Sequence, residues 1–114
     1  MHDIPNRIAN VLLEVEANLR TSGQWEKKQP PMSALASSEP FCIDTLRFQQ
    51  WLQWIFLPRM KQILEEQQPL PVRSRIYEYA EETLCRKKPP EGRLLSLMKT
   101  FDELIRIQSA AIRH

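Results

Sequence analysis

Hydrophobic residues recur every three or four positions along most of the chain, with polar residues between them. In the first such segment the apolar positions are Ile4, Ile8, Val11, Leu12, Val15 and Leu19. This spacing predicts an amphipathic helix over residues 4–21. Pro5 suits its first turn, and Gly23 stands just past its end, where helices commonly stop.

Three further segments show the same periodicity, at residues 44–66, 74–85 and 91–112. Asp44 and Ser74 are candidate N-caps for the first two of them. The segment over residues 44–66 is apolar around most of its circumference, which is typical of a central helix with several neighbours. Pro58 interrupts it, so we expect a kink, or a break into two helices, near residues 54–58.

Residues 22–43 contain a glycine, three prolines and four serines, which resist a continuous helix. Trp25 and Phe41 are nevertheless apolar, so we expect an ordered loop packed across the bundle. With no strand-like alternation and no internal repeat, the pattern predicts one all-α domain over residues 1–114. Its predicted architecture is a compact four-helix bundle whose central helix is kinked or broken near Pro58.

Composition and charge agree with a small globular domain. The 114 residues are 42% hydrophobic and 26% charged, enough for one modest core. The net charge of +2 is too small to imply a nucleic-acid or membrane partner by itself. No apolar run approaches the roughly 18 residues of a membrane span, and the first residues do not resemble a secretion signal.

The residues that usually carry catalysis or bind metals are scarce. Cys42 and Cys85 are the only cysteines, outside any CxxC pattern, and the two histidines are the terminal His2 and His114. The sequence therefore predicts reduced thiols, no metal or cofactor site, and a protein that is not an enzyme. An unfamiliar active site around Asp44 and Arg59 remains an alternative, which requires the two side chains to converge in a pocket.

The middle of the chain resembles the YqcC-like family of small bacterial proteins. The resemblance rests on Pro40-Phe41, Asp44-Thr45, Trp51-Leu52-Gln53-Trp54, Pro58-Arg59-Met60 and Pro69-Leu70-Pro71, and extends over roughly residues 5–112. It implies a soluble helical bundle in the bacterial cytoplasm, often encoded beside a tRNA pseudouridine synthase. The family has no established activity, so no catalytic residue is carried over.

The leading functional hypothesis is a non-catalytic adaptor that binds a protein partner. Its predicted surface comprises Trp25, Phe41, Trp54, Pro58 and Arg59, where the loop crosses the proline-interrupted helix and apolar side chains can stay exposed. Two simpler interpretations compete with it. Trp51 and Trp54 can instead fill the core, and Arg59 can pair with an acidic neighbour or cap a carbonyl freed by the kink.

The alternative hypothesis is an RNA-binding accessory protein, linked to tRNA modification through the family resemblance. Its candidate phosphate contacts are Arg86, Lys87, Lys88, Arg93 and Lys99. Basic residues after a helix also complement its dipole, and Asp102 and Glu103 offset the charge along the last helix. The apolar stripe of that helix is compatible with an intramolecular bundle or with a homo-oligomer seam.

Overall fold

A computed structural model describes the protein over residues 3–84 and 92–112. The regular elements in this part of the chain are all helical, and the longest are α1 (Ile4–Thr21) and α6 (Gly92–Ile112). The shorter ones are α2 (Met32–Leu35), the 3-10 helix η1 (Pro40–Cys42), α3 (Phe48–Trp51), the π-helical segment η2 (Leu52–Phe56), α4 (Leu57–Glu65) and α5 (Ile76–Leu84). The prediction of an all-α bundle is confirmed.

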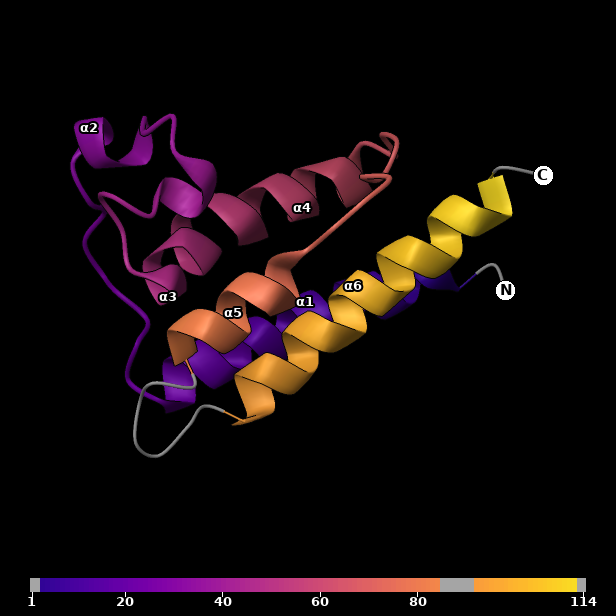
Figure 1. Ribbon diagram of the computed structural model, residues 1–114, viewed down its shortest axis with the longest axis horizontal. Helices are drawn as coiled ribbons and strands as arrows, with labels where there is room; N and C mark the ends of the chain where they lie inside the picture. The colour runs from indigo at the N-terminus through magenta and orange to yellow at the C-terminus, as the bar shows by residue number, and fades with distance from the viewer. Residues whose placement is uncertain (1–2, 85–91, 113–114) are drawn as a thin grey trace.

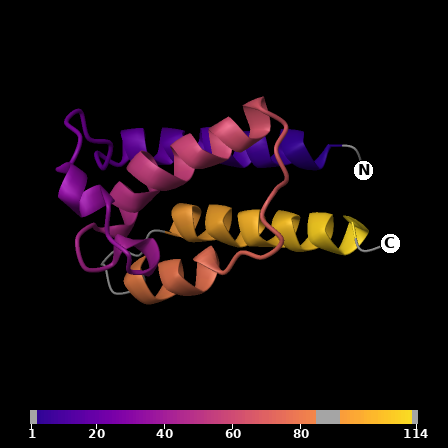
Figure 2. The same cartoon turned by 90° about the horizontal axis from the view of Figure 1, so that it is seen from above.

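The long helices run along one another in opposite directions. α1 packs against α6 and α4, and α5 packs against α6 (Figure 1). Figure 2 shows α1 and α4 on one side and α5 and α6 on the other, with the segment between α4 and α5 crossing from one side to the other. The beginning of α1 and the end of α6 lie at the same end of the molecule, and α2 lies at the opposite end.

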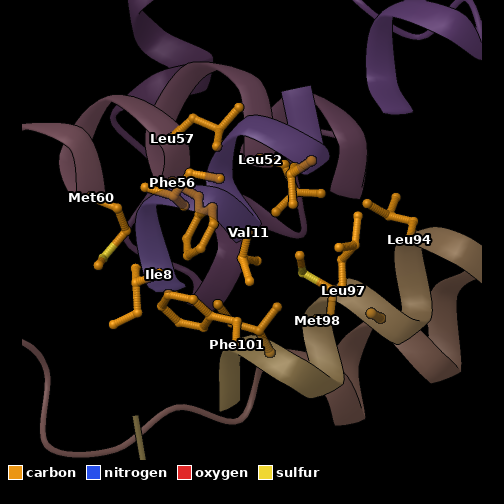
Figure 3. Close-up of a cluster of buried hydrophobic side chains, with 14 of the residues drawn as sticks. Ile8, Val11, Leu52, Phe56, Leu57, Met60, Leu94, Leu97, Met98 and Phe101 are labelled. Carbon is orange, nitrogen blue, oxygen red and sulfur yellow. The ribbon is translucent and has the colours of Figure 1, made fainter. Parts of the chain in front are cut away.

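The core forms where α1, α6 and the helix from α3 to α4 meet. From α1, the predicted stripe is buried from its second member onward, at Ile8, Val11, Leu12, Val15 and Leu19. Figure 3 shows Ile8 and Val11 facing side chains of the other two helices. Phe56 and Phe101 meet edge to face there, with ring centroids 4.9 Å apart, so aromatic contact joins the central helix to α6.

The central helix begins at Phe48, and Asp44 does not cap it. Instead, the Asp44 carboxylate accepts a hydrogen bond from the Ser37 hydroxyl at 2.6 Å, within the loop. The cap comes from inside the helix, because the backbone N–H of Arg47 donates to Oε1 of Gln50 at 2.8 Å. A glutamine at the third helical position thus satisfies a donor that would otherwise lack a partner.

The irregularity expected near Pro58 is a π turn. The N–H of Leu57 bonds to the carbonyl of Leu52, five residues earlier, and the backbone stays right-handed helical at both ends of η2. Pro58 follows at once, and in a regular α-helix its ring would crowd the carbonyl of Trp54. The wider turn relieves this crowding without interrupting the helix.

α5 begins with a cap supplied by α6. The Asp102 carboxylate accepts hydrogen bonds from the backbone N–H groups of Ile76 and Tyr77, at 3.3 and 2.9 Å. Ser74, the predicted cap, donates its hydroxyl to the same carboxylate instead. A negative charge at a helix N-terminus is also attracted to the positive end of the helix dipole. Asp102 therefore holds α5 onto α6.

Two helices end in the same hydrogen-bonded motif, in which the residue after the C-cap has a left-handed backbone conformation. After α1 that residue is Gly23 (φ 77°), and the next N–H, of Gln24, bonds to the carbonyl of Leu19 at 2.9 Å. After α4 the equivalent residue is Gln67 (φ 52°), and Gln68 bonds back to Ile63 at 2.9 Å. A side chain with a Cβ is strained in this conformation, and glycine is not.

We therefore expect Gln67→Gly to raise the free energy of unfolding by about 0.5–1 kcal/mol, since it removes the left-handed strain. Urea denaturation measures this change. Gln68→Gly is the matched control, because Gln68 has no positive φ and should be slightly destabilised by the substitution. A Gln67→Gly protein less stable than the parent would contradict the assignment.

Candidate partner-binding site

The loop after α1 is held onto the central helix by a buried glutamine. The backbone N–H of Glu26 donates to Oε1 of Gln53 at 2.8 Å, and Nε2 of Gln53 donates to the carbonyl of Glu26 at 2.7 Å. Gln53 belongs to η2 and is only 5% exposed. One side chain thus satisfies both backbone groups of a loop residue, much as a neighbouring strand does in a sheet.

The side chain of Glu26 is equally occupied. It accepts hydrogen bonds from the indole N–H of Trp54 at 3.1 Å and from Nε2 of Gln50 at 3.1 Å. Arg47 adds an ion pair at 3.4 Å. These contacts fix the orientation of the Trp54 ring, because the N–H edge of the indole is held against the loop. Part of the ring remains exposed.

Trp25 is held from the other side by α1. Its backbone N–H bonds to the carbonyl of Leu19 at 3.0 Å, as part of the turn that ends the helix. The Arg20 guanidinium lies over the indole ring, 4.3 Å from its centroid. A cation at this distance is attracted to the ring face, so Trp25 is also held in one orientation.

These two tryptophans line a shallow hollow of about 650 Å³ between α1, the loop and α4. Its apolar surface comes from Trp25, Trp54, Leu57 and Pro58. Three of the five residues predicted to form the partner surface therefore meet in one place. The hollow has an apolar floor and a charged rim, the usual composition of a small binding site.

Three of the five charged residues that line the hollow are basic, and Glu26, one of the two acidic ones, is already paired with Arg47. Glu16 bonds to both Lys61 and Arg20, each at 3.0 Å. The hydrogen bond from Lys61 and the one from Arg20 hold the pKa of Glu16 below its ordinary value, against the opposing effect of its burial. Lys27 is exposed at the rim and has no ion pair within the described part of the chain. Two cations thus share one carboxylate, and a third is unpaired.

The other two predicted residues lie elsewhere. The Phe41 ring stacks on Tyr79 with centroids 4.3 Å apart and meets the edge of Trp51 at 4.9 Å. It therefore ties the loop to α3 and α5 and does not face the hollow. Arg59 is exposed, lines no part of the hollow, and forms no ion pair in residues 3–84 and 92–112.

The tryptophans are neither buried core nor free surface. Trp25, Trp51 and Trp54 are all half-buried. Trp51 stacks on Phe48 and Phe56 at the edge of the core, with centroids 6.1 and 5.5 Å away. Of the three tryptophans, only Trp25 and Trp54 line the hollow, and Trp51 does not.

The structure describes two of the five predicted RNA-contact residues, Arg93 and Lys99. Arg86, Lys87 and Lys88 lie outside the described residues. Arg93 forms an ion pair with Glu14, which links α6 to α1. Lys99 lies on α6 with its ammonium 5.9 Å from the Tyr77 ring centroid, so it belongs to a different part of the surface.

The two residues of the alternative active site, Asp44 and Arg59, lie in separate segments of the fold. Asp44 is hydrogen-bonded within the loop, Arg59 lies on α4, and neither lines the hollow. The described residues contain no cluster of histidine, cysteine or acidic side chains suited to a metal ion. They also contain no helix both long and apolar enough to cross a membrane.

The chain has clear relatives among known proteins. A family model described as "DUF446: tRNA pseudouridine synthase C" matches residues 7–104. The uncharacterised protein YqcC of Escherichia coli K12 is 32% identical over 99 residues, which are 87% of this chain and 91% of YqcC. The solution NMR structure of YqcC has a TM-score of 0.78 at 31% identity, covering 90% of this chain and 87% of that one, so the bundle is shared.

Another relative carries the similar segment inside a longer protein. The tRNA pseudouridine synthase C of Pectobacterium carotovorum subsp. carotovorum is 42% identical over 66 residues. These residues are 58% of this chain but only 18% of the synthase, so the chain matches a small part of that protein.

We expect Gln53→Ala to lower the free energy of unfolding by about 2 kcal/mol, because it leaves the N–H and carbonyl of Glu26 without partners. Urea denaturation measures the loss, and trypsin should cleave faster after Lys27 and Lys28 as the loop detaches. Gln62→Ala, the same change at an exposed position of α4, should stay within about 0.5 kcal/mol. Equal losses in the two variants would contradict the role given to Gln53.

The Glu16 carboxylate predicts a pH-dependent contribution to stability. Because its folded pKa lies below the ordinary value of 4.5, the ionised form stabilises the fold above that pH. Glu16→Gln should therefore cost up to about 1 kcal/mol at pH 7, and the difference should shrink below pH 4.5 and vanish below the folded pKa. Unfolding measured from pH 7 to pH 3 tests this, with Glu65→Gln, the same change at an exposed position of α4, as the matched control.

Proposed function

The chain belongs to the DUF446 family, and we propose that it is a non-catalytic binding module that docks a protein partner in the hollow between Trp25 and Trp54. The observation that carries the proposal is that both indoles are partly exposed yet held in fixed orientations. Tryptophan is among the residues that most often dominate binding energy at protein interfaces. A rigid aromatic ring loses little conformational entropy when a partner covers it.

The hollow favours a particular kind of partner segment. Its floor of indole, leucine and proline suits one or two apolar side chains. Its basic residues are Lys27, Lys61 and Arg20, of which the last two share Glu16, and its other carboxylate, Glu26, is paired with Arg47. An acidic side chain beside the apolar anchor would complement this rim and exclude basic segments.

A tRNA pseudouridine synthase is the partner that the relatives favour. In the Pectobacterium relative, a similar segment is covalently part of a protein named tRNA pseudouridine synthase C. In Escherichia coli, YqcC matches this chain over 91% of its own length, so there the segment is nearly a whole protein. Segments that are joined in one organism and separate in another often associate, because joining them only raises their effective concentration.

The test is co-expression with the tRNA pseudouridine synthase C of the same organism, followed by nuclease treatment and purification through a tag on the synthase. We expect a complex that survives nuclease and that Trp25→Ala weakens at least about tenfold, as measured by calorimetry with the purified proteins. Trp54→Phe keeps an aromatic ring but loses the indole N–H that bonds to Glu26, and it should weaken the complex less than Trp25→Ala does.

Leu13→Ala is the matched control, since Leu13 is a large apolar residue of α1 that is 62% exposed and does not line the hollow. It should leave the affinity unchanged. The proposal is overturned if no complex forms, or if Trp25→Ala and Leu13→Ala weaken the complex equally.

A further inference from the structure

A second groove, separate from the hollow, lies between residues 72–75 and α6. It has a volume of about 570 Å³, and its principal side chains are Arg73, Arg75, Tyr77, Lys99, Asp102 and Arg106. None of the residues that line the hollow contributes to it. An inference about this groove is therefore independent of the partner site proposed above.

Cations reach the groove from two segments that are distant in the sequence. Arg73 and Arg75 are two residues apart on the irregular segment that leads into α5, and both are exposed. Lys99 and Arg106 are seven residues apart and so lie on the same face of α6. The cap formed by Asp102 holds these two segments together, and so brings the four cations to one groove.

The acidic groups of the groove are largely engaged already. Asp102 accepts from Ser74 and from two backbone N–H groups of α5, and Glu103 bonds to Arg106 at 3.2 Å. Arg73 and Arg75 form no ion pair within the described residues, although Glu78 also lines the groove. Their guanidinium groups are therefore available to an anion from outside.

An aromatic ring lies among these cations. The Lys99 ammonium is 5.9 Å from the centroid of the half-buried Tyr77 ring, which lines the groove. Planar guanidinium groups bind phosphate in a bidentate manner, and aromatic rings stack on unpaired bases. A groove that offers both matches the alternating phosphates and bases of single-stranded nucleic acid better than it matches a carboxylate-rich protein segment.

We propose that this groove binds the sugar-phosphate backbone of an unpaired RNA segment, with Arg73, Arg75 and Lys99 as the phosphate contacts and Tyr77 as the stacking surface. Of the two basic residues singled out by the sequence pattern that the structure describes, Lys99 takes part and Arg93 does not. The main contacts come from residues 73 and 75, which precede a helix instead of following one.

The test is fluorescence anisotropy with a fluorescein-labelled, unmodified tRNA transcript, which offers unpaired loops, at several salt concentrations. Arg73→Glu and Lys99→Glu should each weaken binding about tenfold or more, and Arg75→Gln should lower the slope of log K against log salt by about 1. All three side chains are exposed, so circular dichroism should show intact helices.

Arg59→Glu is the matched control, because it changes the net charge equally at an exposed position of α4 outside the groove. It should weaken binding less than about threefold. The proposal is overturned if the parent protein does not bind the transcript at low salt, or if Arg59→Glu weakens binding as much as Arg73→Glu. It is also overturned if polyglutamate displaces the transcript as effectively as unlabelled RNA, which would indicate an acidic protein segment instead.

Discussion

The arrangement of the candidate site depends on one buried polar side chain. Gln53 positions the loop after α1, because its side-chain amide accepts a hydrogen bond from the N–H of Glu26 and donates one to the carbonyl of Glu26. Once Glu26 is placed, its carboxylate orients the Trp54 indole, and the turn after α1 orients Trp25. An apolar residue at position 53 would leave the N–H and the carbonyl of Glu26 without these partners.

The fold and the site meet in the π-helical segment. Gln53 and Trp54 both belong to η2, the segment whose wider turn also accommodates Pro58. A polar contact with the loop, a half-buried indole and a proline therefore lie close together along one continuous helix. π turns are common at functional sites because they re-aim side chains while the helix continues.

The repeating patterns in the sequence predicted most of the fold. The α1 stripe, the glycine after it and the disturbance near Pro58 are local signals, and the structure has each of them where it was expected. The caps were predicted less well, since the Asp102 carboxylate comes from a residue 25 positions after Tyr77 and competes successfully with Ser74. For the site, the aromatic residues of the sequence indicated Trp25 and Trp54. The hydrophobic pattern does not show that Gln53 pairs with Glu26. It also does not distinguish Phe41, which lies elsewhere, from the two tryptophans of the hollow.

The π turn also sets the rotational phase of the central helix. Each residue of an α-helix turns the chain by about 100°, and a π turn accommodates one residue more than an α turn does over the same length. The extra residue within η2 therefore helps to set which face of α4 is turned to the core, the face that carries the buried Leu57 and Met60. In effect, η2 accommodates a one-residue insertion within a continuous helix. A relative that lacked one residue there would have to compensate with another shift, or turn α4 away from α1.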